Sequence, residues 1–235
     1  MIFVSLVLVL IASLAGLLLS RTKFIESLSL ELIALGAGAM TSVALVHIYP
    51  EAISINPHAV YAFLLGFLVV YILENASIVH PCVEDHCHFH SLSLWSFSGL
   101  IVHTLFDGVG IWAGFSSGPE LGMLVTLGVL VHQIPVSLSL AGLSKRAHFD
   151  DKKRTILFAL FALAAPLGAL LALRMLGGLS EELLAYPLAF AGGSLLYIGA
   201  SDLLPLVHKD SHKHLSLIGM FVLGTGLSVI AKFFE

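Results

Sequence analysis

Residues 102–115 read VHTLFDGVGIWAGF, and the ionisable side chains in this stretch are His103 and Asp107. The residues around them are apolar, so the stretch belongs to a segment that can cross a bilayer as a helix. A charged carboxylate in the middle of a membrane is costly unless it is paired, protonated or bound to a metal ion. The stretch therefore predicts a functional site inside a membrane-spanning helix.

The composition of the whole chain agrees with a membrane setting. Of its 235 residues, 58% are hydrophobic and 11% are charged, with a mean hydropathy of +1.00. A soluble domain carries roughly 25% charged residues. Apolar runs of about 20 residues recur, and each is long enough to cross a bilayer. We therefore expect one all-α polytopic membrane domain over residues 1–235. Its eight predicted transmembrane helices cover residues 1–20, 31–50, 59–75, 94–116, 120–143, 155–173, 186–206 and 215–234.

Lysine and arginine residues predict the orientation of these spans. One side of the alternating topology carries nine of the 11, and the other side carries Arg174 and Lys232. Positively charged loops stay in the cytoplasm, so both termini should lie outside, in a plasma or inner membrane. The loops expected in the cytoplasm are 76–93, 144–154 and 207–214. The first span lacks a preceding basic segment, so we expect it to be retained as a helix rather than cleaved as a signal peptide.

The second and seventh spans share a pattern. Residues 36–52 read GAGAMTSVALVHIYPEA and residues 191–207 read AGGSLLYIGASDLLPLV. In both, small residues come first, and a polar residue stands three positions before a proline, at His47 and at Asp202. The two spans run in opposite directions across the membrane. The pattern predicts that spans 1–3 and 6–8 are inverted repeats around spans four and five, a 3+2+3 arrangement typical of transporters.

The fifth span adds a histidine that we expect at the same depth in the membrane as His103 and Asp107. Residues 128–143 read GVLVHQIPVSLSLAGL, and His132 lies near the middle of this span. His103 and Asp107, four residues apart, share one face of their helix. Pro135 leaves the carbonyl of Val131 without its helical partner and bends the helix beside His132.

Two imidazoles and one carboxylate suit Zn²⁺, Fe²⁺, Cd²⁺ or Mn²⁺. We therefore predict a metal site formed by His103, Asp107 and His132, with Thr104, Gln133 and Met40 as auxiliary groups. The plainer alternative is that these side chains form ordinary hydrogen bonds between helices. Gly108 and Gly110 would let a neighbouring helix approach closely and bring the two faces together.

Other polar groups predict a route and a second metal-binding segment. Ions would enter near His47 and Glu51 and leave near Glu74 and Asp202. The third loop contains HPCVEDHCHFH, and short His/Cys-rich tracts bind Zn²⁺. The metal-binding residues expected in this loop are His80, Cys82, His86, Cys87, His88 and His90. A disulfide between its two cysteines is not expected in the cytoplasm.

The stretches HTLFDG (103–108) and HQIPVS (132–137) resemble the paired signatures of the ZIP family of divalent-metal transporters, HNxPEG and HExPEG. Eight spans, outward termini, a histidine-rich third loop and the HxxPE of residues 47–51 extend the resemblance over the whole chain. The resemblance implies uptake of Zn²⁺ or a similar ion toward the cytoplasm through spans four and five. His103 matches the first metal-binding histidine of the family, Asp107 matches its glutamate, and His132 matches the first motif position of the fifth span.

The chain departs from the family motifs at several positions. Thr104 stands in place of asparagine and Phe106 in place of proline. In the fifth span, Gln133 replaces an acid, Val136 replaces the second glutamate and Ser137 replaces glycine. Family members with two adjacent metals use carboxylates from both spans. Because the fifth span here contributes none, we expect one principal metal site.

We thus expect a metal transporter rather than an enzyme, with the divalent ion as substrate and no cofactor required. The sequence has no GxxxxGK[ST] phosphate loop, so an ion gradient, the membrane potential or a coupled ion would drive the flow. The expected partners are metal ions and lipid, with no nucleic acid, and a homodimer is left open. Two alternatives are an intramembrane zinc hydrolase, for which no HExxH motif is present, and a non-transporting metal sensor.

Overall fold

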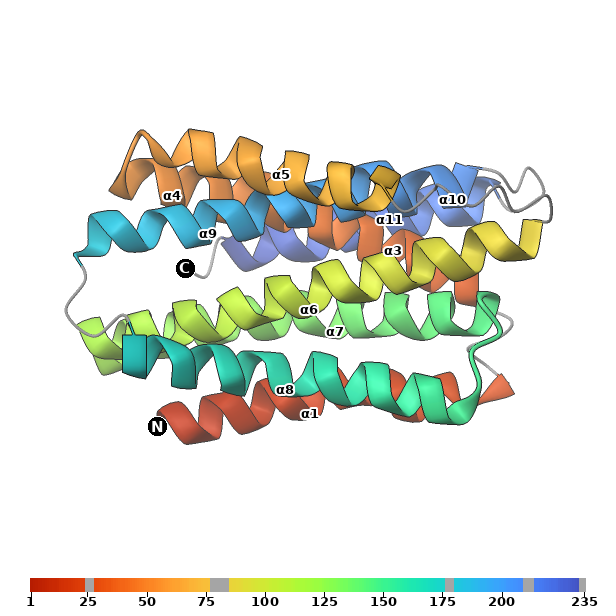
Figure 1. Cartoon of the computed structure of the whole chain (residues 1–235), viewed down its shortest axis with the longest axis horizontal. Helices are drawn as coiled ribbons and strands as arrows, with labels where there is room; N and C mark the ends of the chain where they lie inside the picture. Colours follow the sequence, from red (N-terminus) through yellow and green to blue (C-terminus); the bar gives the residue numbers. More distant parts are fainter. Residues whose placement is uncertain (24–27, 77–84, 176–179, 209–213, 233–235) are drawn as a thin grey trace.

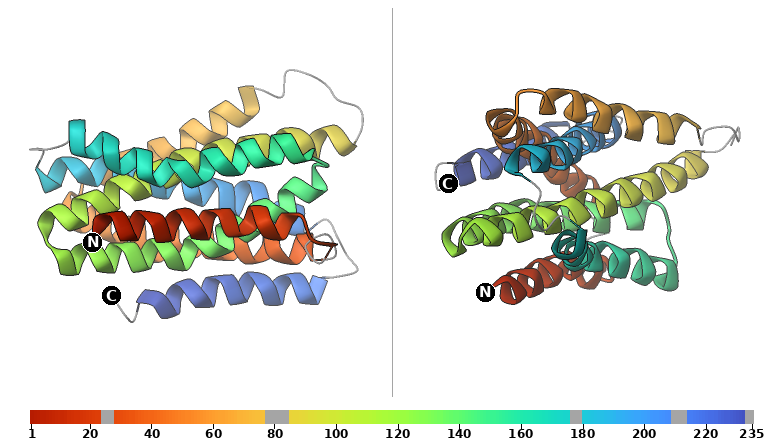
Figure 2. Two further views of the ribbon diagram at one scale, coloured as in Figure 1. Left: turned by 90° about the horizontal axis from the view of Figure 1, so that it is seen from below. Right: turned by 60° about the vertical axis from the view of Figure 1, so that its left-hand side comes forward.

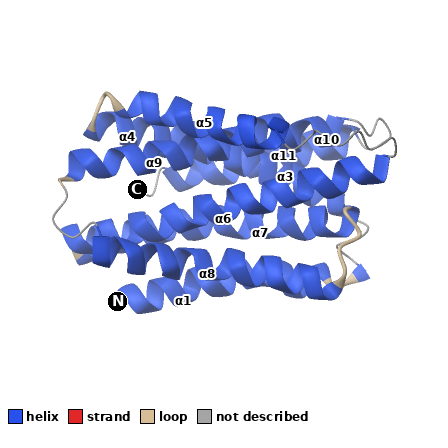
Figure 3. Cartoon of the chain, in the orientation of Figure 1, coloured by secondary structure: helices blue, strands red, loops and turns tan. Residues whose placement is uncertain are grey.

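The computed structural model describes residues 1–23, 28–76, 85–175, 180–208 and 214–232, and its regular structure is helical throughout these ranges (Figures 1 and 3). Within these described ranges, eight helical segments follow one another. Six of them are α1 (Ile2–Ser20), α5 (Ala59–Ala76), α6 (Asp85–Ser117), α7 (Pro119–Arg146), α8 (Asp151–Met175) and α11 (His214–Lys232). The other two each contain a π-helical segment: α3 (Ser29–Ser42), η1 (Val43–Ile48) and α4 (Tyr49–Ile55), and then α9 (Glu181–Leu196), η2 (Tyr197–Leu203) and α10 (Leu204–His208).

Membrane-spanning capacity follows from length and hydropathy. In the described part of the chain, 6 helices are long and apolar enough to cross a bilayer, and shorter apolar helices cover Ala59–Ile72 and His214–Ile230. The side chains that face outward are large and apolar, as on α8, where Ile156, Leu160 and Leu167 are each 50% exposed. Such side chains suit contact with lipid. The chain is an all-helical polytopic membrane protein, as predicted.

One predicted boundary is wrong. The loop expected over 76–93 is helical in its second half, because α6 begins at Asp85 rather than near residue 94. The sequence contains no glycine or proline between Pro81 and Gly99. A helix satisfies its backbone groups internally whether it lies in lipid or in water, so it continues past the apolar segment until a breaking residue occurs.

The helices form two layers that run lengthwise side by side (Figures 1 and 2). The first layer contains α1, α6, α7 and α8, in which α1 packs on α7 and α6 packs on α8. The second layer contains α3, α5, α9 and α11, in which α3 packs on α11 and α5 packs on α9. Contacts of α3 with α7 and of α6 with α9 join the layers. The main apolar core draws on both layers and includes Met40, Leu140, Phe158 and Ile198.

Glycines allow the closest helix crossings. A Cβ on Gly108 of α6 would collide with the carbonyl oxygen of Ala165 in α8, and a Cβ on Gly168 of α8 would collide with that of Leu105 in α6. Small residues at such crossings let backbones approach and gain van der Waals contact where lipid gives no hydrophobic drive. The expectation that Gly108 brings α6 toward α7 is wrong, because its close neighbour is α8. Gly110 has only an ordinary contact with Val125 of α7.

Candidate metal centre

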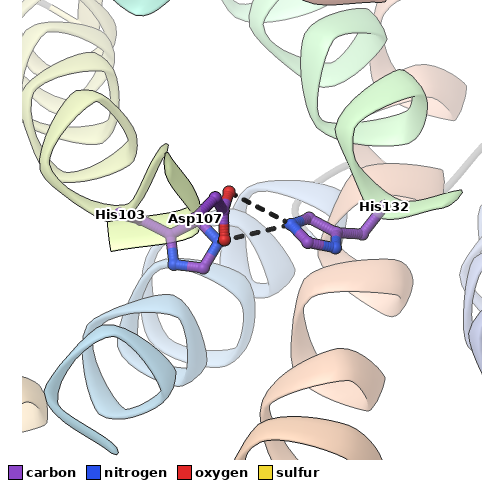
Figure 4. A group of neighbouring side chains, drawn as sticks. All are labelled: His103, Asp107 and His132. Carbon is purple, nitrogen blue, oxygen red and sulfur yellow. Dashed lines mark hydrogen bonds and ion pairs between the residues drawn. The ribbon is translucent and has the colours of Figure 1, made fainter. Parts of the chain in front are cut away.

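His103, Asp107 and His132 converge at one point between α6 and α7, and Figure 4 shows the three side chains pointing toward one another. The Nε2 atom of His103 lies 3.4 Å from Oδ1 of Asp107, and Nε2 of His132 lies 3.4 Å from Oδ2 of the same carboxylate. The two Nε2 atoms are also 3.4 Å apart. Among the described residues, these three form the group whose ligand atoms lie close enough together to hold a metal ion.

The spacing of the donor atoms fits a small divalent ion. Zn²⁺ binds imidazole nitrogen at about 2.0–2.1 Å, so two ligands of a tetrahedral site lie roughly 3.3–3.4 Å apart. The three separations in this group have that length, although the two histidines face different oxygens of Asp107. Three protein ligands leave a fourth position for water, as in sites that exchange their contents. The arrangement can therefore bind a divalent ion without enclosing it completely.

A backbone hydrogen bond orients His132 for this role. Its Nδ1 lies 3.1 Å from the carbonyl oxygen of Gly128, one helical turn earlier in α7. Because a carbonyl only accepts hydrogen bonds, Nδ1 must carry the proton and donate. In the neutral imidazole, a proton on Nδ1 leaves Nε2 with a lone pair on the side of Asp107 and His103, which is the tautomer that a metal ligand needs.

The group is buried at the middle of apolar helices. His103 is 0% exposed, His132 is 4% exposed and Asp107 is 9% exposed. The apolar part of α6 covers Phe97–Ser116, with His103 and Asp107 near its centre, and His132 lies well inside Val125–Arg146 of α7. A carboxylate at this depth needs a compensating charge. Its neighbours are histidines, so a bound cation would supply that charge most directly.

The predicted auxiliary residues do not all face this group. Gln133 donates from Nε2 to Oγ of Ser13 in α1 at 2.6 Å, and Met40 is buried in the main apolar core. Thr104 is fully buried, and its hydroxyl has no hydrogen-bond partner among the described residues. The auxiliary roles of Gln133 and Met40 gain no support from these contacts, and that of Thr104 stays a prediction.

The predicted route residues lie at different places in the bundle. His47 belongs to η1, and its Nε2 is hydrogen-bonded to the carbonyl oxygen of Ser228 in α11 at 2.8 Å. Glu51 is exposed on α4, whereas Asp202 is buried in η2. Glu74 lies in α5, outside the described side chains. Of the three route residues whose side chains are described, His47, Glu51 and Asp202, none joins the central group, and the route remains a prediction.

The histidine- and cysteine-rich segment cannot be assessed at side-chain level. His80 and Cys82 lie outside the described residues. The backbone of α6 includes the remaining four predicted ligands, but their side chains also fall outside the description. These four are His86, Cys87, His88 and His90.

Sequence reasoning missed the residues of α1 that meet α7. Ser137 donates from Oγ to the carbonyl oxygen of Ser13 at 2.7 Å, and the backbone N–H of Gly16 donates to Oγ of Ser137 at 2.9 Å. The available signal was the pair Ser13 and Gly16, three residues apart on one face of an otherwise apolar helix. In the sequence, Ser137 stands out only as a departure from the family motif.

Helices with lipid-facing apolar surfaces and a buried His/Asp group define a polytopic membrane protein with a candidate metal site. The family model described as ZIP Zinc transporter matches residues 80–232, which is more than half of the chain and includes all three residues of the site. The chain therefore belongs to the ZIP zinc transporter family. Members of this family are transporters rather than enzymes, which removes support from the hydrolase alternative.

Individual relatives are similar over part of their length. The chain is 26% identical to Zinc transporter ZIP9-A of Xenopus laevis over 192 residues, which cover 77% of this chain and 62% of that protein. It is 27% identical to Zinc transporter ZIP9 of Micropogonias undulatus, covering 72% of this chain and 57% of that protein. A shorter match to Zinc transporter ZIP4 of Homo sapiens is 33% identical and covers 47% of this chain and 17% of that protein. The chain thus spans about three fifths of the ZIP9 proteins that it matches.

Proposed function

We propose that this protein transports a divalent metal ion, with Zn²⁺ as the favoured substrate, across a membrane toward the cytoplasm. The observation that supports the proposal most is the set of three 3.4 Å separations among the donor atoms of His103, Asp107 and His132. These separations match the distance between neighbouring ligands of a tetrahedral zinc site, and the group lies in the middle of two apolar helices. A site placed at mid-membrane serves movement of an ion from one side to the other better than storage at a surface.

The proposed architecture is a pair of inverted repeats around α6 and α7. Three features support it. The packing of α1 on α7 corresponds to that of α8 on α6, and the packing of α3 on α11 corresponds to that of α9 on α5. Both long segments of the second layer contain a π-helical turn, η1 and η2. Gly38 and Gly193 each precede the next proline by twelve residues, and each meets a phenylalanine carbonyl of the neighbouring helix.

We further propose that the site holds one ion at a time. Asp107 is the carboxylate of the three-residue group. Relatives with two metals carry acids at two positions of the fifth span. In this chain those positions hold neutral residues: Gln133, which is hydrogen-bonded to α1, and Val136, which is buried in the main core. One carboxylate leaves a bound divalent ion with net positive charge. Binding should therefore be weaker than at a site with several carboxylates, which favours release.

Metal influx into proteoliposomes tests the proposal. The purified protein is reconstituted, and uptake of Zn²⁺, Cd²⁺, Fe²⁺ and Mn²⁺ is followed for the wild type and for Asp107→Ala. Saturable influx that disappears in the variant is the expected result. Metal binding without influx in the wild type would contradict transport and favour the remaining alternative, a membrane metal sensor.

A further inference from the structure

A group of buried polar side chains joins α1 to α7 directly beside the metal centre. Ser13, Gln133 and Ser137 are each 0% exposed. Gln133 donates to Oγ of Ser13, Ser137 donates to the backbone carbonyl of Ser13, and the N–H of Gly16 donates to Ser137. We call these four residues the α1–α7 joint. Polar groups at this depth in a membrane are costly to leave unpaired, so their pairing holds the two helices in one relative position.

The donors and acceptors of the joint are fixed by their neighbours. The hydroxyl of Ser13 gives its hydrogen to the carbonyl of Val9 at 2.8 Å, so it can only accept from Gln133. This settles which end of the Gln133 amide faces α1. Ser137 uses its hydroxyl both to donate and to accept. A Cβ on Gly16 would collide with Ser137, so the contact requires glycine at this point of α1.

The joint lies at the turn of α7 that contains Pro135. Pro135 lies inside α7 and cannot donate to the carbonyl one turn earlier, which loosens the helix at that turn. Gln133 and Ser137 stand on either side of this proline, and both are bonded to α1. Hydrogen bonds from a neighbouring helix thus replace rigidity that the proline removes.

The joint acts on the metal centre through His132. Consecutive residues of an α-helix point about 100° apart, so Gln133 faces α1 while His132 faces Asp107 of α6. Fixing the rotation of α7 about its own axis therefore fixes the direction of the imidazole. A metal site tolerates errors of only about 10–20° in the direction of its ligands.

We propose that Gln133 and Ser137 are positioning residues of the metal site, which hold α7 through Ser13 and Gly16 at the rotation that aims His132 at Asp107. They do so without contacting the ion. The inference rests on the proposed function, since it assigns these residues a role in binding the same divalent cation. The inference also assigns a positioning role to Gln133 and Ser137, two positions at which the chain departs from the family motif.

Binding of Co²⁺ to the purified full-length protein in lipid nanodiscs tests the inference, with affinity and the visible absorption of bound Co²⁺ as readouts. The variants are Ser137→Ala and Gln133→Met. The matched control is Ser144→Ala, because Ser144 is also fully buried on α7 but donates only to Ala141 of its own helix. We expect roughly tenfold weaker binding and an altered Co²⁺ spectrum for the two variants, the size seen when supporting partners of metal ligands are lost. The control should match the wild type.

Ser13→Ala removes, from the α1 side, the hydroxyl that accepts the hydrogen bond of Gln133. This variant replaces Ser137→Ala in the test if Ser137→Ala fails to fold. Wild-type affinity and spectrum in the folded joint variants would overturn the inference. Lower thermal stability with an unchanged Co²⁺ spectrum would also overturn it, because it would indicate a structural role alone. The proposed function fails separately, if wild-type Co²⁺ binding is the same as that of Asp107→Ala.

Discussion

Asp107 is the carboxylate of the candidate metal centre, and both of its oxygens face a histidine nitrogen. Its position is expensive without a cation, because α6 is apolar on either side of it. His132 reaches it from another helix in the tautomer set by Gly128. Two imidazoles and one carboxylate make a metal site of modest charge, which suits the reversible binding that the proposed transport requires.

Asp107→Asn keeps the shape of the side chain and removes its charge, so Zn²⁺ binding at the centre should fall by more than about 100-fold. Loss of a supporting partner alone costs 10–100-fold, and loss of the charged ligand should cost more. Isothermal titration of the purified protein measures the change. Glu120→Gln is the control, since Glu120 is exposed in the first turn of α7.

The same titrations report the number of ions at the centre. Asp107→Asn should remove one equivalent of bound Zn²⁺ per chain relative to the wild type. Loss of two equivalents in this variant would mean that Asp107 bridges two ions, and the single-site proposal would then be wrong.

Helix α8 packs against α6, the helix that contributes His103 and Asp107 to the candidate metal centre. Gly168 of α8 lies against the carbonyl of Leu105, which is between His103 and Asp107 in the sequence. The reciprocal contact is that of Gly108 with Ala165. This crossing and the α1–α7 joint support α6 and α7, the two helices of the candidate metal centre, from neighbouring elements of the same layer.

Gly168→Ala should destabilise the protein by about 1–3 kcal/mol, because the added methyl group overpacks a backbone contact. Thermal unfolding in detergent measures the effect. Gly219→Ala on α11 is the matched control, since a Cβ there meets nothing within 4 Å. The control should be neutral or stabilising by up to about 1 kcal/mol. Equal destabilisation by both substitutions would contradict the role of the crossing.

Because the helices of both layers run lengthwise, the described loops between them lie at the two ends of the bundle (Figure 1). The loop between α7 and α8, with the cations of 145–154, lies at the opposite end of the bundle from the turn between α4 and α5 (Figure 1). Arg154 ties the cationic end together, because its guanidinium donates to the carbonyls of Ser20 and Phe149. The charge distribution in the sequence predicts that this end is cytoplasmic.

Cysteine labelling in intact cells tests the orientation. In a background with Cys82 and Cys87 replaced by serine, Ser54→Cys places a thiol at the exposed end of α4, and Lys152→Cys places one at the exposed start of α8. A membrane-impermeant maleimide should label residue 54 from outside and residue 152 only after permeabilisation. The reverse pattern would invert the proposed direction of transport.

Much of the fold was predictable because it depends on local properties of the chain. Length and apolarity of each run determine whether a helix can span lipid, and these are visible in the sequence. The shared face of His103 and Asp107 follows from helix geometry. The start of α6 at Asp85 was missed, because the apolar run marks the lipid layer whereas the helix ends where glycine or proline occurs.

Helix rotation and packing partner were decided only by the tertiary structure, because they depend on contacts between segments far apart in the chain. The sequence placed His132 inside an apolar span, but α6 and α7 had to pack before its imidazole could meet Asp107. Likewise, Gly108 predicted a close helix contact, but the sequence did not indicate that the neighbour is α8. Gln133 is visibly a polar residue in an apolar run, but the sequence did not indicate that it faces α1. The residues of the site were therefore present in the sequence, and the directions in which they point come from the neighbouring helices.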